Sequence, residues 1–226
     1  PLDCMGCGEC VTVCPTKAIA MVPQESQADQ QAVFDYCVAN ISKKPSKFAD
    51  DTVIGSQFNQ PLLEFSGSCA GCAETSYARL ITQLFGERMY ISNATGCSSI
   101  WGGSAPATPY TVNKETGKGP AWANSLFEDN AEHGFGMAIG QKTIRAKLKG
   151  YVEEVLNSDA AEEIKTAAKA YLDTFEDGAK NGAATDALVA ALEGCGCDLA
   201  KKILAEKDYL AKKSVWIFGG DGWAYD

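Results

Sequence analysis

The sequence predicts an α/β protein in two parts: a small cysteine-rich module at the N-terminus and a larger domain built on a parallel sheet. Three observations predict this fold class. Four cysteines crowd the first fourteen residues, a helix–strand–loop pattern begins near residue 65, and an apolar strand over 214–218 runs into glycines. A strand that ends in a glycine-rich loop is typical of parallel α/β sheets, whose ligands bind at the carboxyl ends of the strands.

Composition excludes several classes of function. The 226 residues are 46% hydrophobic, so the chain can bury a sizeable core in one or two domains. The net charge of −9 argues against nucleic-acid binding, because a phosphate-binding surface needs clustered Lys and Arg. No apolar stretch approaches the roughly 18 residues of a membrane helix, and no signal segment opens the sequence. We therefore expect no membrane association and a cytoplasmic location.

The N-terminal cysteines form the strongest motif. Cys4, Cys7, Cys10 and Cys14, followed by Pro15, give the run C-x2-C-x2-C-x3-C-P, which is typical of bacterial 4Fe–4S ferredoxins. In two-cluster ferredoxins, three thiolates of such a run bind one cluster and the fourth binds the other. We therefore expect residues 1–24 to form half of a two-cluster ferredoxin-like module, with its partner run outside this chain. An all-thiolate zinc site is the alternative.

The remainder of the chain divides into two regions by amino-acid composition. Residues 25–64 are rich in Gln, Ser, Asp and Lys, which predicts a linker with one short helix near 31–40. Residues 65–226 are expected to form the larger domain, with a mostly helical segment over about 130–213. Apolar spacing predicts strands at 18–22, 89–93 and 214–218, and helices at 73–85, 160–175 and 199–213.

A second cysteine set lies in the larger domain. Cys69 and Cys72 form a C-x2-C pair among small residues, and Cys97 follows in a Gly/Ser-rich loop after the strand 89–93. The spacing fits three ligands of a further metal cluster, with a fourth from outside the chain. A structural or redox role for these cysteines, or half of a zinc site, stays open at this point.

Three other cysteines are given no metal role. Cys195 and Cys197 are too close in sequence to bind one metal as a C-x2-C pair does. We expect them in a surface loop between helices, with a regulatory disulfide as the alternative. Cys37 is expected to be buried as a small apolar side chain.

The end of the apolar strand 214–218 carries a candidate diphosphate site. Gly220, Asp221 and Gly222 follow it closely. Mg2+ binds one or two carboxylates together with phosphate oxygens and waters, and glycines let backbone N–H groups approach a phosphate. This pattern predicts that Asp221 holds Mg2+ against a diphosphate.

Together these residues resemble pyruvate:ferredoxin oxidoreductase of the large single-chain kind. The resemblance covers nearly the whole chain and rests on the Cys4–Pro15 run and on the segments 67–75, 94–102, 124–130 and 219–226. It implies a partial ferredoxin-like 4Fe–4S module followed by an incomplete thiamine-diphosphate-binding α/β domain with a parallel sheet. Thiamine diphosphate, Mg2+ and three 4Fe–4S clusters in the full enzyme are the implied cofactors.

The resemblance also implies residue roles. Cys4, Cys7 and Cys10 resemble three ligands of one ferredoxin-module cluster, and Cys14 resembles the single ligand of its neighbour. The ligands of a cluster proximal to the thiamine correspond to Cys69, Cys72 and Cys97, and the residues lining the thiamine pocket correspond to Glu74 and Cys97. The Mg2+ ligand corresponds to Asp221, and the residues around the diphosphate correspond to Gly220, Gly222 and Trp223. No residue is assigned as a general base.

The activity implied is oxidative decarboxylation of pyruvate with coenzyme A to acetyl-CoA and CO2, with electrons passed to ferredoxin or flavodoxin by a homodimer. The first ferredoxin run, a fourth proximal cysteine and further Mg2+ ligands are missing. We therefore expect a piece of a longer enzyme, inactive alone, that works with remaining domains of the same chain. The alternatives are a related enzyme for another 2-oxoacid and a non-catalytic iron–sulfur electron carrier.

Overall fold

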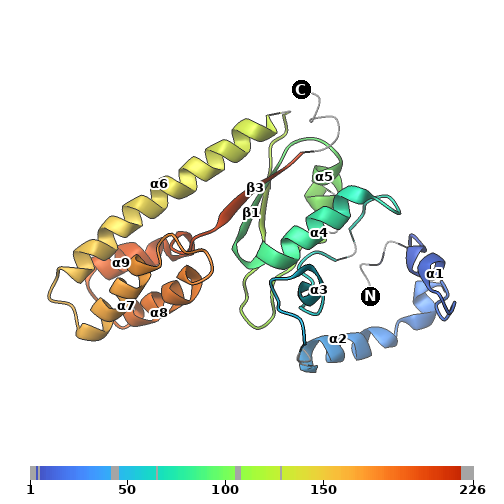
Figure 1. Ribbon diagram of the computed structural model, residues 1–226, viewed down its shortest axis with the longest axis horizontal. Coiled ribbons are helices and arrows are strands. Elements are labelled where there is room, and N and C mark those ends of the chain that lie inside the picture. The colour runs from blue at the N-terminus through green and yellow to red at the C-terminus, as the bar shows by residue number, and fades with distance from the viewer. Residues whose placement is uncertain are drawn as a thin grey trace. The chain divides into compact units, whose positions relative to one another are not determined.

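The computed structural model describes residues 4, 6–41, 46–64, 66–104, 108–127 and 129–219. The chain divides into two compact units. The first, called the sheet unit below, comprises Pro1–Asn130 and Phe218–Asp226, and the second, the helical unit, comprises Ala131–Ile217. Figure 1 labels the elements of both units along the chain.

The N-terminal part of the sheet unit contains short helices joined by extended chain. They are α1 (Glu9–Val13), a 3-10 turn (Gln24–Gln27), α2 (Gln30–Asn40) and α3 (Val53–Ser56). The helix predicted near 31–40 is confirmed, whereas α3 was not predicted. Cys37 is only partly buried, which contradicts the expected packing role, because α2 buries none of its residues.

The strand predicted at 18–22 is wrong, since these residues belong to no strand. Ile19, Met21 and Val22 are apolar, yet about half of each side chain is exposed. Apolar residues become a strand only when a neighbouring strand takes up their backbone hydrogen bonds. The described residues provide no such neighbour for this segment.

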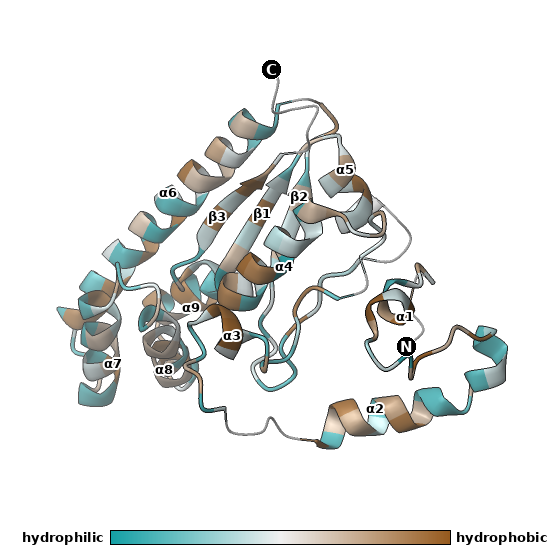
Figure 2. Ribbon diagram, turned by 45° about the vertical axis from the view of Figure 1, so that its right-hand side comes forward, coloured by the Kyte–Doolittle hydropathy of each residue, from teal (hydrophilic) through white to brown (hydrophobic). Residues whose placement is uncertain are grey.

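A three-stranded sheet organises the rest of this unit. Its elements are α4 (Ala73–Phe85), a 3-10 turn (Gly86–Arg88), β1 (Met89–Asn93), α5 (Cys97–Ser99), a π-helical turn (Ile100–Ser104), β2 (Ala121–Asn124) and β3 (Ser214–Phe218). The strand order is β2-β1-β3 (Figure 2), and β1 and β2 run parallel with Asn93 opposite Asn124. The predicted α4, β1 and β3 are confirmed, and β2 was not predicted.

The sheet is packed on both faces around β1. Ile91 and Ser92, which point to opposite faces of β1, are both fully buried, as expected for the central strand of a parallel sheet. Leu63, Ala78 and Trp101 form a small apolar core beside it. Gly103 lies against the Trp122 indole so closely that a Cβ there would come within 2.5 Å of the ring. Only glycine therefore fits at this point of the π-helical turn.

The helical unit contains most of α6 (Asn130–Leu156), with α7 (Glu162–Asp173), α8 (Asn181–Glu193), α9 (Asp198–Ala205) and a 3-10 turn (Lys207–Tyr209). The helices predicted at 160–175 and 199–213 are both shorter in the structure. The core of this unit is built from Leu148, Val152, Val155, Ile164, Ala168, Tyr171, Leu188, Leu192, Ala200, Ile203 and Leu210.

The charged side chain of Arg145 is buried in this core and has hydrogen-bond and aromatic partners there. Arg145 is 8% exposed and donates from Nε to the Leu210 carbonyl at 3.2 Å and from Nη2 to the Phe175 carbonyl at 2.8 Å. Its guanidinium lies 4.0 Å from the centroid of the Phe175 ring. A buried cation is tolerated only with such partners, so Arg145 ties α6 to the chain after α7 and after α9.

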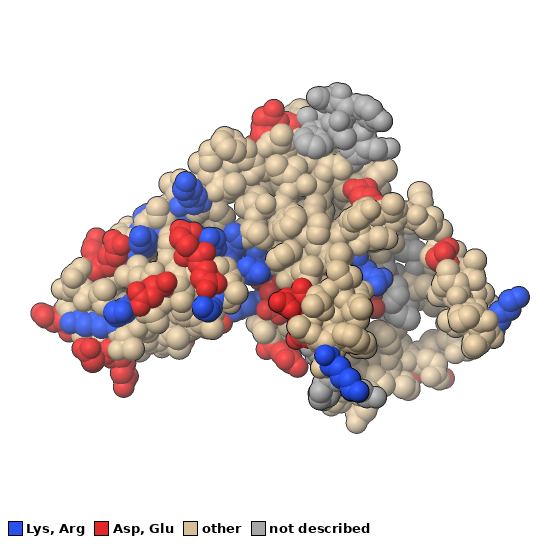
Figure 3. Space-filling model, viewed as in Figure 1, with Lys and Arg blue, Asp and Glu red and all other residues tan. Residues whose placement is uncertain are grey.

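Charges of both signs alternate over the surface of the helical unit (Figure 3). Ion pairs such as Lys147–Glu206 at 2.6 Å and Lys212–Glu176 at 2.7 Å link its elements. Pairs this exposed contribute little stability, so the apolar core holds the unit together. Among the helices that the structure describes, none is long and apolar enough to cross a membrane.

We expect Leu188→Ala to destabilise the helical unit, because it removes a fully buried side chain from the core. A buried Leu→Ala change costs about 2–5 kcal/mol of unfolding free energy. Urea unfolding followed by far-UV circular dichroism measures the loss. Leu126→Ala is the matched control, because Leu126 is 83% exposed. Equal effects of the two substitutions would contradict the core assignment.

Candidate functional site

The N-terminal cysteines lie on a loop that glycines allow to turn sharply. Gly6 and Gly8 have φ values of 71° and 75°, a left-handed conformation that other residues rarely adopt. Cys4, Cys7 and Cys10 are exposed, and Cys10 lies in α1, which begins directly after Gly8. The three thiols therefore occupy a short, glycine-turned segment that lies open to solvent.

Cys14 is surrounded by hydrogen-bond donors. The backbone N–H of Ala18 donates to Cys14 Sγ at 3.4 Å, and the Thr16 hydroxyl lies 3.6 Å from the same sulfur. The hydrogen bond with the Thr16 side chain, and after it the one from the Ala18 backbone, lowers the pKa of the Cys14 thiol below its ordinary value. Iron binds the thiolate form. The donors around Cys14 thus suit a sulfur that carries negative charge.

The second cysteine set occupies two turns at helix starts. The Cys72 N–H donates to the Cys69 carbonyl at 3.1 Å, with Gly71 between them at φ 73°. Cys72 then caps α4, and its carbonyl accepts from Thr75 Oγ1 at 2.9 Å. This turn presents Cys69 to solvent and holds Cys72 partly buried.

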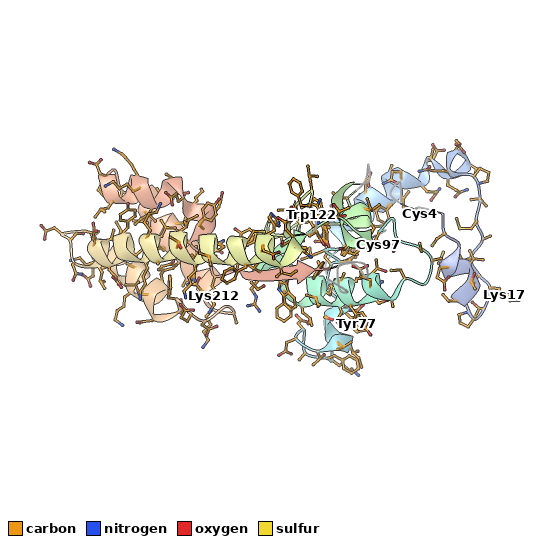
Figure 4. All side chains as sticks on the ribbon, turned by 90° about the horizontal axis from the view of Figure 1, so that it is seen from above. Cys4, Lys17, Tyr77, Cys97, Trp122 and Lys212 are labelled. Carbon is orange, nitrogen blue, oxygen red and sulfur yellow. The ribbon has the colours of Figure 1, made fainter. Side chains whose placement is uncertain are left out.

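Cys97, labelled in Figure 4, lies at the other turn, four residues after the end of β1. It begins α5 and is exposed, while the Gly96 N–H donates to Ser99 Oγ at 3.0 Å behind it. Within the described ranges, no three Cys, His, Asp or Glu side chains lie close enough to hold a metal. Metal–thiolate bonds draw such groups together, because thiolates alone repel one another. The assignment of Cys69, Cys72 and Cys97 to one cluster stays a prediction.

Glu74, predicted to line a cofactor pocket, lies in the first turn of α4 and is partly buried. Burial, with a smaller contribution from the Glu74 charge, raises the pKa of the Tyr110 hydroxyl. Tyr110 itself packs against the small core of the sheet unit. The Tyr110 hydroxyl is buried and has no hydrogen-bond partner among the residues described.

A hydrogen-bond network converges on the Phe218 carbonyl, where β3 ends. Ser98 Oγ donates to this oxygen at 3.2 Å, and Asn130 Nδ2 donates to it at 2.8 Å. Asn93, the last residue of β1, satisfies its amide when the nitrogen faces Ser98 Oγ and the Phe218 carbonyl, each at 2.8 Å, and the oxygen accepts from Trp122 Nε1. Three side chains thus surround one backbone oxygen.

The network joins five elements, β1, β2, β3, α5 and α6. Asn93 and Asn130 are both fully buried, and Ser98 is 1% exposed. Ser92 Oγ donates to Asn130 Oδ1 at 3.4 Å, which fixes the Asn130 side chain. Because unpaired buried amides are costly, these contacts define where the chain leaves β3 at Gly219.

Two further buried side-chain oxygen atoms remain open, one at the carboxyl end of β2 and one directly before α6. Asn124 Oδ1 and Asp129 Oδ1 are buried and have no hydrogen-bond partner in the part of the chain that the structure describes. Asn124 is opposite Asn93 across the sheet. Amide and carboxylate oxygens are ligands that Mg2+ and polar cofactors use. The open oxygen of Asn124 at this sheet edge is therefore of a kind that can ligate Mg2+.

The predicted residues Gly220, Asp221, Gly222 and Trp223 lie outside the described residues. The structure describes the chain as far as Gly219, directly before them. The roles of Asn93, Ser98 and Asn130 were missed from the sequence. A polar residue ending an otherwise apolar strand was the available signal for Asn93.

Comparisons with known proteins match the N-terminal cysteine-rich segment to a family model and the whole chain to longer proteins. The family model for the 4Fe-4S binding domain matches residues 1–20, which supports 4Fe–4S clusters in this module. The whole chain is 50% identical to "Pyruvate-flavodoxin oxidoreductase" of Klebsiella pneumoniae and 50% identical to "Pyruvate:ferredoxin oxidoreductase" of Moorella thermoacetica, and covers 20% of each.

A third relative is named for another electron acceptor. The whole chain is 44% identical to "Pyruvate dehydrogenase [NADP(+)]" of Cryptosporidium parvum and covers 14% of that protein. The chain spans about a fifth of the length of the first two of these relatives. From its first residue to its last, the chain is therefore similar to one segment of the pyruvate-flavodoxin and pyruvate:ferredoxin oxidoreductases.

Proposed function

We propose that this chain forms part of an enzyme that oxidatively decarboxylates pyruvate with coenzyme A to acetyl-CoA and CO2. Electrons would leave through 4Fe–4S clusters to ferredoxin or flavodoxin. The observation that carries the proposal is the buried network on the Phe218 carbonyl, three residues before Asp221. An iron–sulfur carrier without a diphosphate cofactor does not need the carboxylate of Asp221 after such a strand end.

The sheet edge is the proposed site of thiamine diphosphate and Mg2+. Asp221 would ligate the metal, and the backbone N–H groups of Gly220 and Gly222 would face the diphosphate. When bound, thiamine diphosphate supplies the reactive carbon and the electron sink that 2-oxoacid decarboxylation needs. Trp223 and Glu74 are proposed to line the cofactor pocket. This division suits a chain in which no residue is assigned as a general base.

The cysteines are proposed to form the electron path. Cys69, Cys72 and Cys97 would hold the cluster proximal to the thiamine, with a fourth ligand from elsewhere. Each 4Fe–4S cluster transfers one electron at a time, at a potential that hydrogen bonds to its sulfurs adjust. The Ala18 N–H and the Thr16 hydroxyl would have this role at Cys14.

Substrate choice, assembly and location complete the proposal. We propose a cytoplasmic homodimer, with the rest of the polypeptide supplying the pyruvate and coenzyme A sites. The test is to purify, without oxygen, the full polypeptide that carries this sequence. Ferredoxin and flavodoxin reduction is then measured with pyruvate, 2-oxobutyrate, 2-oxoglutarate or an aromatic 2-oxoacid, each with and without coenzyme A.

Pyruvate should give the highest kcat/KM, and omission of coenzyme A should strongly lower turnover. If another 2-oxoacid gives a higher kcat/KM, that acid and not pyruvate is the preferred substrate. If the purified protein contains neither thiamine diphosphate nor Mg2+ and has no activity on any 2-oxoacid, the enzyme proposal is rejected. The non-catalytic electron carrier then remains as the function.

Removal of a cluster ligand should lower the iron content. We expect Cys4→Ser to lose about one cluster of iron and acid-labile sulfide per polypeptide, together with part of the brown absorption, because serine is a poor ligand for iron–sulfur clusters. Cys37→Ser, a partly exposed cysteine in α2, is the matched control. Stoichiometric zinc in a colourless protein would contradict the iron–sulfur assignment.

Loss of the Asn130 amide should loosen the diphosphate site. Asn130→Ala removes a donor to the Phe218 carbonyl. Substitution of residues that hold a metal site in place from outside typically lowers metal affinity by about 10–100-fold. We expect a loss of affinity of that size for Mg2+ and thiamine diphosphate, measured by calorimetry on the full polypeptide. Asn40→Ala, at an exposed position of α2, is the control. Lower stability with unchanged cofactor affinity would assign Asn130 a purely structural role.

A further inference from the structure

The helical unit contains two thiols in direct contact. Cys195 Sγ donates to Cys197 Sγ at 2.7 Å, at the junction between α8 and α9. Both cysteines belong to the helical unit, whereas the cysteines assigned to clusters belong to the sheet unit. The proposed electron path therefore makes no use of this pair.

The two thiols have different surroundings. Cys197 is exposed and caps the first turn of α9, where helix N–H groups favour negative charge. Cys195 is partly buried, and its side chain packs against the core of the helical unit. Cys197 is thus the sulfur that a dissolved molecule reaches first, with Cys195 directly behind it.

The chain between them leaves room for a bond. Gly196 has no neighbouring atoms within 4 Å of where a Cβ would be, so the junction can adjust without a clash. Residues two apart along an extended chain lie at most about 7 Å apart at Cα, and a disulfide needs about 4.4–6.8 Å. With the two sulfurs already 2.7 Å apart, this range is compatible with a disulfide between them.

Local charge favours the thiolate of Cys197. The hydrogen bond from Cys195 is the main reason that the pKa of Cys197 is lowered, and the backbone N–H of Ala200 lowers it further. The Asp198 carboxylate acts in the opposite direction, but Lys201 lies 3.6 Å from it and offsets part of its charge. Reactive cysteines are found in surroundings of this kind.

We propose that Cys195 and Cys197 form a redox-active dithiol that exchanges with small disulfides such as oxidised glutathione. The Cys197 thiolate attacks one sulfur of the small disulfide, whose S–S bond breaks and releases one thiolate. The Cys195 thiol then loses its proton and attacks Cys197 Sγ, which releases the second thiolate. The dithiol is oxidised by two electrons, and one small disulfide is reduced to two thiols.

The product is a short-ring, exposed disulfide, a type that is readily reduced again. The site would therefore respond to the ratio of oxidised to reduced thiols around the protein. It needs neither the clusters nor the sheet-edge cofactor, so it stands independently of the proposed enzyme activity.

The test uses the full chain equilibrated without oxygen in glutathione buffers of increasing oxidised fraction. Free thiols are then alkylated and the protein is cut with trypsin. Cys195 and Cys197 fall together in the peptide 181–201, which contains no other cysteine, and Cys37 falls alone in the peptide 18–43. Mass spectrometry follows both peptides.

We expect the peptide 181–201 to convert to a form that lacks two hydrogen atoms and takes up no alkylating agent. The control peptide should carry only an alkyl group or one glutathione. Cys195→Ser should trap a mixed disulfide at Cys197, and Cys197→Ser should slow the first exchange step about tenfold. Two alkylated thiols, two glutathione adducts or a cross-link between chains at the most oxidising ratio would overturn the proposal.

Discussion

The Phe218 carbonyl is the point on which the proposed chemistry depends. A strand end in a parallel sheet is free to fray, since its last backbone groups have no further ladder partner. Here Ser98 and Asn130 donate to that oxygen, and the Asn93 amide is oriented toward it as well. Each of these donors is buried, so breaking a contact leaves an unpaired polar group out of reach of water. The direction in which the chain leaves β3 is thereby set for the residues that follow.

The same network connects the two proposed sites of the sheet unit, the diphosphate site and the cluster loop. Ser98 follows Cys97 in α5, and Asn93 ends the strand that leads into the Cys97 turn. A substitution at Ser98 would therefore act on both the strand end and the proposed cluster loop. Close coupling of this kind is expected where an electron donor and its first acceptor must keep a constant separation. The helical unit rests instead on its own apolar core around Arg145.

Much of the fold follows from local pattern, and the remainder depends on partners far along the chain. The amphipathic spacing of Ala73–Phe85 and the apolar runs Met89–Asn93 and Ser214–Phe218 predict α4, β1 and β3. The run 18–22 fails as a strand because pairing depends on a neighbour that spacing does not reveal. β2 was missed because its short Ala-Trp-Ala-Asn sequence carries little strand pattern.

The candidate site divides in the same way. Cysteine spacing predicts the cluster ligands from the sequence, because the geometry of a cluster restricts the gaps between them. No spacing rule connects Asn130 with Phe218, which lie 88 residues apart. Such contacts become visible only once the sheet brings the strand ends together. The Cys195–Cys197 contact was anticipated only as an alternative, since two cysteines separated by glycine can point in opposite directions.

A crystal structure of the full polypeptide with thiamine diphosphate and Mg2+ tests the central claim most directly. The account predicts that an Asp221 carboxylate oxygen coordinates Mg2+ at about 2.0–2.1 Å. It also predicts that Ser98 and Asn130 still donate to the Phe218 carbonyl in that complex. Mg2+ bound without Asp221, or the diphosphate held at another edge of the sheet, would contradict it.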